Sequence, residues 1–284
     1  MAYYVILDSG HNEYVSGKRS PNGTLKEWQW NNNVQVKLKK RLEEHGIIVY
    51  QTNPSPSGKN EIGLTKRCTL ANDKYRAWGR PSNCLFVSIH GNASGVNKDN
   101  SGWCSPRGVE VFVANNASTK SRNAASHICS CLYSDIYALD NGFKNRGVKT
   151  ENFTVIYNTI MPCLLIEHAF YDNYKDYILM LNKIDAFVEA DVKGICKHFG
   201  IIYKAPIITV PKPPTTSTSF VVRVTTDSLN VRKGASTSYP IVTTVHKGDA
   251  FTIVEVNGSW GLLKSYSSAR NGWVNISSSY VQKI

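Results

Sequence analysis

Three short apolar segments of the chain each end near a side chain that can bind a metal ion. They lack polar alternation, which is typical of strands covered on both faces in the middle of an α/β sheet. In open α/β sheets, ligands bind in the crevice beyond the carboxyl ends of the strands. We therefore expect two imidazoles and a carboxylate to meet there. The segments and their polar ends are Tyr3–Leu7 with His11, Cys84–Ile89 with His90, and Cys163–Ile166 with Glu167.

A second carboxylate, Glu27, belongs to the same edge. The sequence predicts a helix over 25–45, ended by Gly46, whose apolar stripe recurs every fourth residue. Glu27 continues that stripe one turn upstream, on the face that packs against the sheet. A buried carboxylate is costly unless it is paired or bound to a metal. Because this helix follows the first strand, its N-terminal end lies near His11.

These four side chains match the needs of a zinc hydrolase. Such enzymes use three protein ligands of histidine or carboxylate type and leave a fourth position for water. The metal lowers the pKa of that water to roughly 7 and polarises the scissile carbonyl, and a further carboxylate moves the proton. One assignment makes His11, Glu27 and His90 the ligands and Glu167 the general base and acid. The alternative exchanges the two glutamates, and the spacing leaves both open.

Strands and helices alternate through the first two hundred residues. This order predicts an α/β fold with a mostly parallel, twisted sheet and helices on both faces. A polar, glycine-containing stretch over 97–107 predicts an active-site loop, and 141–147 a further loop. The remaining predicted strands are 47–50, 109–113 and 153–157, and the remaining helices are a helix from Leu64 to Trp78, 121–139, 175–182 and 185–198.

The composition narrows the class of protein. With 284 residues, 42% of them hydrophobic, the chain has ample material for packed cores. The net charge of +12 favours polyanionic partners, among them nucleic acid, anionic lipid or a bacterial wall. The basic residues are dispersed without an aromatic-interleaved cluster, so we expect no nucleic-acid binding. The seven cysteines lack metal-site spacing and predict buried free thiols, formed in a reducing compartment.

The N-terminus and the hydropathy bear on location. Met1 leads directly into the first strand without a signal peptide, and no apolar run approaches the roughly 20 residues needed to span a bilayer. We therefore expect synthesis in the host cytoplasm, without membrane insertion.

A change of composition divides the chain. We predict a catalytic domain over 1–204, a linker over 205–219 and a second domain over 220–284. The linker is rich in proline, threonine and serine. Beyond it, short strands recur about every ten residues between glycine turns, which predicts a small all-β barrel.

The motifs of the first domain are similar to those of a known family. These motifs are Val5-Ile6-Leu7-Asp8-x-Gly10-His11, Glu27, Phe86-Val87-Ser88-Ile89-His90-x-Asn92, Pro162-Cys163-Leu164-Leu165-Ile166-Glu167-x-x-Phe170-x-x-Asn173, Arg67 with Ala71-Asn72, and Arg146-Gly147-Val148-Lys149. Their order and residues resemble the zinc-dependent N-acetylmuramoyl-L-alanine amidases of the amidase-3 type. The resemblance covers residues 2 to 200. It implies Zn²⁺ on His11, Glu27 and His90, with Glu167 as the catalytic glutamate. The implied substrate is the amide between muramic acid and the first L-alanine of the stem peptide.

Some positions depart from the family pattern. Asn12 follows the first histidine where glycine is usual, Ala169 stands where Glu-x-Gly-Phe is common, and Tyr157 or Asn158 replaces an arginine. None of these is an implied ligand, so they bear on substrate preference.

Other polar residues receive lesser roles. Asn92 and Arg146, both within the motifs, are candidate substrate-binding residues. His168 follows Glu167 on a strand and should point to the opposite face, as a structural residue. Asp8 is expected to support the turn before His11. Glu110 and Glu151 are weaker candidates for substrate contact, and the other histidines, His45, His127, His198 and His246, lack a convergent partner.

The tail resembles a bacterial SH3 domain over residues 220 to 284. The resemblance rests on Ser228-Leu229-Asn230-Val231-Arg232, Gly248-Asp249, Gly258-x-Trp260-Gly261 and Gly272-Trp273-Val274. The resemblance implies a cell-wall-binding module. Trp260 and Trp273 are candidate groove aromatics, although barrel core is the favoured alternative for a tryptophan beside a glycine turn. Further candidate contacts are Arg232, Lys233 and Tyr239.

The whole chain is thus expected to be a peptidoglycan hydrolase that a basic module holds at a Gram-positive wall. Lack of a signal peptide with a substrate outside the membrane favours release by lysis, as for a phage endolysin; a mother-cell lysin fits too. Two alternative hypotheses are a zinc carboxypeptidase acting on stem peptides and a catalytically silent wall-binding protein. The oligomeric state is not predicted.

Overall fold

The computed structural model describes residues 2–54, 57, 62–96, 99–206, 219–237, 239–264 and 272–284. The chain divides into two units, Met1–Pro206 and Ile207–Ile284. Most of the predicted linker, residues 207–218, lies outside the described residues.

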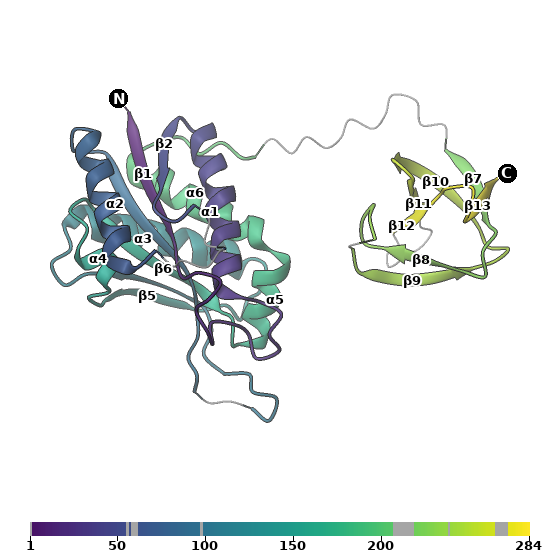
Figure 1. Ribbon diagram of the computed structural model, residues 1–284, viewed down its shortest axis with the longest axis horizontal. Coiled ribbons are helices and arrows are strands. Elements are labelled where there is room, and N and C mark those ends of the chain that lie inside the picture. The colour runs from purple at the N-terminus through teal and green to yellow at the C-terminus, as the bar shows by residue number, and fades with distance from the viewer. Residues whose placement is uncertain are drawn as a thin grey trace. The chain divides into compact units, whose positions relative to one another are not determined.

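The first unit is built on a six-stranded sheet in the order β2-β1-β3-β6-β4-β5 (Figure 1). All neighbouring strands are parallel except β4 and β6, which are antiparallel. The predicted mostly parallel sheet is therefore confirmed. The strands are β1 Tyr3–Ser9, β2 Ile47–Gln51, β3 Cys84–Asn92, β4 Val109–Val113, β5 Asn145–Thr150 and β6 Cys163–Phe170.

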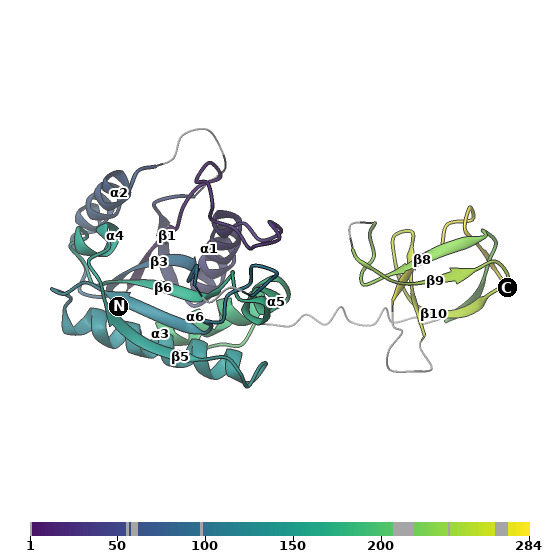
Figure 2. The ribbon, with the colours of Figure 1, turned by 90° about the horizontal axis from the view of Figure 1, so that it is seen from below.

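Helices cover both faces of this sheet. On one face, α1, α3 and α6 pack together over a large apolar core. On the other face, α2 and α4 lie side by side over a smaller core (Figure 1 and Figure 2). The helices are α1 Glu27–Glu44, α2 Leu64–Ala77, α3 Thr119–Tyr137, α4 Thr154–Tyr157, α5 Tyr174–Asn182 and α6 Ile184–Phe199.

The pleat decides which face each strand residue meets, because successive side chains point to opposite faces. In β3, Val87 and Ile89 belong to the larger core and Phe86 to the smaller one. By the same alternation, His90 follows Phe86 and Ser88 on one side of the strand. His168 falls on the opposite face from Glu167, as predicted, and is fully buried.

Two predicted segments differ from the structure. Residues 153–157 were expected as a strand, but Thr154–Tyr157 forms helix α4. Val155 and Ile156 are buried in the smaller core, and a short apolar run does not by itself distinguish a strand from a buried helical turn. The loop predicted over 141–147 overlaps the edge strand Asn145–Thr150, whose half-exposed and exposed residues carry no apolar pattern.

The second unit is a single antiparallel sheet in the order β13-β7-β10-β11-β12-β8-β9. Its core is made by inward-facing aliphatic residues, among them Val222, Val231, Ile253 and Val274. This confirms the all-β prediction. The strands are β7 Phe220–Val224, β8 Ser228–Arg232, β9 Ile241–His246, β10 Ala250–Asn257, β11 Trp260–Leu263, β12 Trp273–Asn275 and β13 Val281–Lys283.

None of the seven cysteines forms a disulfide, and six of them are buried, as predicted. Within the described residues, no helix is long and apolar enough to cross a membrane.

Candidate metal centre

His11, Glu27 and His90 meet beyond the ends of β1 and β3. Oε1 of Glu27 lies 3.2 Å from Nε2 of His11 and 3.2 Å from Nδ1 of His90. The two imidazole rings stand edge to face, with centroids 5.0 Å apart. One donor atom from each residue lies within 4.8 Å of the others, and this is the only such group in the described part of the chain. Segments that are far apart in the sequence thus converge as predicted.

A strained backbone at His11 turns its side chain toward the cluster. Its φ of 60° lies in the left-handed region, which costs a residue other than glycine of order 1 kcal/mol. Two donors hold that conformation through the His11 carbonyl: Asn53 Nδ2 at 3.1 Å and Arg67 Nη2 at 3.2 Å. Arg67 also lies 3.4 Å from Asp8, whose other carboxylate oxygen accepts from Ser88 Oγ. Asp8 therefore supports the turn, as predicted.

The imidazole of His90 packs against the backbone of Gly10, which has no side chain. A Cβ added to Gly10 would lie 2.2 Å from Cε1 of His90, so only glycine leaves room for the ring. From the opposite face, His168 Nδ1 lies 3.0 Å from the carbonyl of His90, while its Nε2 lies 2.8 Å from Asp191. The predicted structural role of His168 thus includes bracing the strand at His90.

The surroundings of Glu27 and Glu167 shift the pKa values of these two glutamates in opposite directions. Burial acts to raise the pKa of Glu27, but hydrogen bonds with His11 and His90 outweigh it and hold the pKa at about 2. Burial raises the pKa of Glu167 well above its usual range, and the charges of Glu27 and Glu110 add to the effect. One carboxylate is thereby kept ionised beside the histidines, while the other is suited to carrying a proton.

Glu167 stands directly beside the cluster. It pairs in register with His90 across β3 and β6, so both side chains emerge on the same face. On its other side it pairs with Glu110 of β4. Glu110 is buried and accepts hydrogen bonds from Asn92 Nδ2 at 2.7 Å and from Arg146 Nε at 2.6 Å, and it contacts Lys149.

The donor set fits a catalytic zinc ion. Two imidazole nitrogens and one carboxylate are the ligand types of such sites, and three protein ligands leave a position for water. Glu27 is almost completely buried, whereas the two histidines keep 21% and 14% of their side chains exposed. The cluster can therefore hold a metal ion with Glu27 on its buried side and leave its other side open to a substrate.

Comparison with known families decides the class of this chain. The family model described as N-acetylmuramoyl-L-alanine amidase, of the amidase-3 type, matches residues 5–197, and the bacterial SH3 domain model matches residues 227–282. The chain belongs to the N-acetylmuramoyl-L-alanine amidase family. It is a peptidoglycan hydrolase that cleaves the amide between N-acetylmuramic acid and L-alanine.

Individual relatives agree with this assignment. The chain is 28% identical to N-acetylmuramoyl-L-alanine amidase CwlM of Bacillus licheniformis, over 72% of this chain and 74% of that protein. It is 28% identical to the endolysin of Bacillus phage SPP1, over 68% of this chain and 64% of that protein. Among solved structures, an N-acetylmuramoyl-L-alanine amidase from Clostridium difficile 630 superposes with a TM-score of 0.60 at 26% identity, covering 70% of this chain and 97% of that one.

The amidase unit brings most of the predicted residues together. The metal cluster contains Glu27 and not Glu167, which favours the first of the two assignments left open by the sequence. The side chains of Asn92 and Arg146 bind Glu110, which is the register neighbour of Glu167. His45, His127, His198 and His246 lie outside the cluster, although the rings of His127 and His198 are 6.3 Å apart.

The SH3 unit corrects one expectation. Barrel core was the favoured alternative for Trp260 and Trp273, but both are half-buried, and neither belongs to the core of the described residues. Trp260 pairs with Asn275 in register, so it shares a face with Trp273, two residues before Asn275. That face is opposite to the buried Val274. Arg232 Nη1 instead donates to the carbonyls of Thr237 and Tyr239, which holds the following turn.

The sequence analysis gave too little weight to one residue near the site, Glu110, and missed another, Asn53. Glu110 was only a weak candidate, although the alternation of β4 already placed it with Phe112 on one face, opposite Val109 and Val111. Asn53 carried no signal, because it lies in a polar loop and acts through a backbone carbonyl.

Proposed function

We propose that His11, Glu27 and His90 hold one Zn²⁺ and that Glu167 is the general base and acid of the amidase reaction. The observation that carries the proposal is the convergence of the three donor groups, with Glu167 as the register neighbour of His90. When bound, the zinc would lower the pKa of a water molecule and polarise the scissile carbonyl.

The residues of the chain supply the proton transfers. Glu167 would accept the proton of the attacking water and deliver it to the nitrogen of the leaving L-alanine. Burial and neighbouring carboxylates raise its pKa, which supports its ability to keep that proton until the amine departs. Glu110, itself paired with Arg146, stands next to Glu167 and would keep its carboxyl group oriented and its pKa high.

We further propose that the SH3 unit holds the enzyme on Gram-positive peptidoglycan through the face of Trp260 and Trp273. The relative named an endolysin and the Bacillus source of the amidase relatives support this. In this proposal the protein is an endolysin, made in the host cytoplasm, that reaches the wall after release.

The decisive experiment identifies the new ends formed when the protein digests Gram-positive peptidoglycan. We expect free N-terminal L-alanine, no new reducing sugar, and loss of activity with a chelator that Zn²⁺ restores. Glu167→Gln should abolish cleavage yet bind zinc in a one-to-one ratio by elemental analysis. The matched control is Glu43→Gln, at an exposed position on α1. Released C-terminal amino acids, or reducing ends, would show that a different bond is cut.

A further inference from the structure

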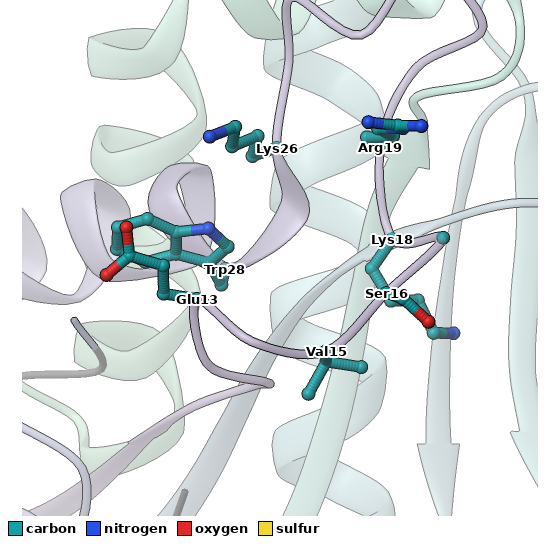
Figure 3. A pocket seen from close by; sticks show the side chains of 8 residues that line it. Glu13, Val15, Ser16, Lys18, Arg19, Lys26 and Trp28 are labelled. Carbon is teal, nitrogen blue, oxygen red and sulfur yellow. The ribbon is translucent and has the colours of Figure 1, made fainter. Parts of the chain in front are cut away.

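A hollow lies between the loop after His11 and the start of α1 (Figure 3). Its volume is about 220 Å³. Nothing in the reaction described above uses it. It is lined by Glu13, Val15, Ser16, Gly17, Lys18, Arg19, Lys26 and Trp28.

Several residues that line the hollow are neighbours of metal ligands in the sequence. Glu13 follows His11 by two residues, and Lys26 and Trp28 flank Glu27. The backbone N–H of Glu27 donates to the carbonyl of Lys18 at 2.9 Å, which ties the loop to the ligand itself. Residues that line the hollow are therefore chain neighbours of two of the metal ligands, with consecutive Cα atoms about 3.8 Å apart.

The loop that forms the hollow is held in place. Arg19 and Lys26 form an antiparallel bridge. Inside that bridge, Ser20 N–H donates to the carbonyl of Leu25 at 2.9 Å, and Leu25 N–H donates to Ser20 Oγ at 3.0 Å. Asn22 Nδ2 fixes the tip by donating to the hydroxyl of Tyr177 on α5 at 3.0 Å. The walls are therefore formed before a ligand arrives, which lowers the cost of binding.

The lining selects for a negative charge next to an apolar wall. The lining carries three cations, Lys18, Arg19 and Lys26, and one carboxylate, Glu13, while the half-buried ring of Trp28 supplies apolar surface (Figure 3). Lys18 is also the cation whose charge reaches Glu167 and acts to lower its pKa. Lysine and arginine bind carboxylates through charge-assisted hydrogen bonds.

We propose that this hollow is a substrate subsite for a carboxylate-bearing residue of the stem peptide. The proposal rests on the amidase function given above. In the intact substrate the lactyl carboxyl group of the muramic acid is part of the scissile amide, so the negative charges next to that bond belong to the peptide. The subsite would place the peptide, rather than the glycan, over the loop of residues 13–19.

The test uses soluble N-acetylmuramoyl-peptides with the full-length, zinc-loaded protein. One substrate has free carboxylates on the stem peptide; in its partners a single carboxylate, either within the stem or at its end, is amidated. We expect amidation of the recognised carboxylate to raise KM about tenfold while kcat changes little, the effect of losing one charge-assisted hydrogen bond. Soluble substrates contain no other wall polymer, so a response to them cannot come from a polyanion such as a phosphate polymer.

Substitutions connect the preference to the hollow. Lys18→Met, Arg19→Met and Lys26→Met alter exposed side chains. At least one should raise KM for the free carboxylate substrate and remove its advantage over the amidated one. Lys40→Met, an exposed lysine farther along α1, is the charge-matched control and should keep the preference.

Each outcome is decisive. Equal kinetics on all substrates would overturn the subsite while leaving the amidase function intact, as would a preference that survives in all three variants. A uniform loss on free and amidated substrates alike would indicate general attraction rather than a subsite. Failure of the wild-type protein to release L-alanine from any substrate would instead refute the proposed function.

Discussion

Glu110 and Glu167 stand directly opposite one another on the antiparallel strands β4 and β6. Two carboxylates on one face of a sheet repel each other when both are ionised. The repulsion is resolved by unequal surroundings. Arg146 and Lys149 neutralise Glu110, and the pKa of Glu110 is lowered although burial opposes this. For Glu167, burial and the charges of Glu27 and Glu110 outweigh the opposing charge of Lys18, and its pKa rises.

This pairing predicts the pH dependence of catalysis. Because the charge of Glu110 raises the pKa of Glu167, removing it in Glu110→Gln should lower that pKa. A general base acts in its ionised form, so the acid limb of kcat/KM against pH should move to lower pH. The measurement is a pH profile of L-alanine release by wild type and variant. A limb that stays in place or moves to higher pH would disprove the coupling.

Gly10→Ala tests the room that the metal site needs. The new Cβ would lie 2.2 Å from the His90 ring, which must then move. Since a misplacement of about 1 Å can cost about a hundredfold in rate, we expect a loss of that order together with weaker zinc binding in a competition titration. Gly63→Ala is the control, because a Cβ there meets nothing within 4 Å. Zinc affinity equal to that of the wild type in Gly10→Ala would show that the His90 ring can move aside without disturbing the metal site.

His198 predicts how the amidase unit responds to acid. Burial lowers its pKa from 6.5 to about 4, and the charges of His127 and Lys120 add to the effect. Between these pH values the unfolded chain binds the extra proton, so stability is present above pH 6.5 and is lost as the pH falls toward 4. Allowing for the partial exposure of the ring, the contribution is about 1–2 kcal/mol.

Urea unfolding of wild type and His198→Gln at several pH values measures this contribution. Both proteins are studied with a chelator, so that loss of metal in acid does not enter the comparison. They share the same SH3 unit, and the difference between them therefore reports on the amidase unit. The variant should lose less stability than wild type on acidification. Parallel pH dependences would rule His198 out as the source.

The SH3 unit offers a test of wall binding. Trp260→Ala and Trp273→Ala remove half-buried rings from one face, and we expect each to weaken sedimentation with purified walls about tenfold, as for an aromatic anchor. Cleavage of soluble muramoyl-peptides should stay unchanged, because the substrate then needs no anchoring. Tyr280→Ala, an exposed aromatic of the same unit, is the control. If both tryptophan variants sediment like wild type, the wall is bound elsewhere.

The architecture of the amidase unit and the chemistry of its metal centre could be predicted from the sequence alone. Uninterrupted apolar runs such as Cys84–Ile89 identified the buried parallel strands, and strand–helix alternation implied that their carboxyl ends share an edge. A glutamate on the apolar stripe of a helix was itself a signal, since Glu27 is 1% exposed and pairs with both histidines. Local pattern was less informative for Thr154–Tyr157, where a strand was expected and a helix formed, because four residues carry too little periodicity.

Tertiary structure decided what surrounds those donors. The antiparallel insertion of β4 between β6 and β5 brought Glu110 against Glu167, and no local pattern states which strand becomes the neighbour of which. The bracing of His11 by Asn53 and Arg67 likewise runs through a backbone carbonyl, which any residue possesses. The sequence shows the type of each side chain and the spacing of apolar residues. Strand order and backbone hydrogen bonds depend instead on how the whole chain packs.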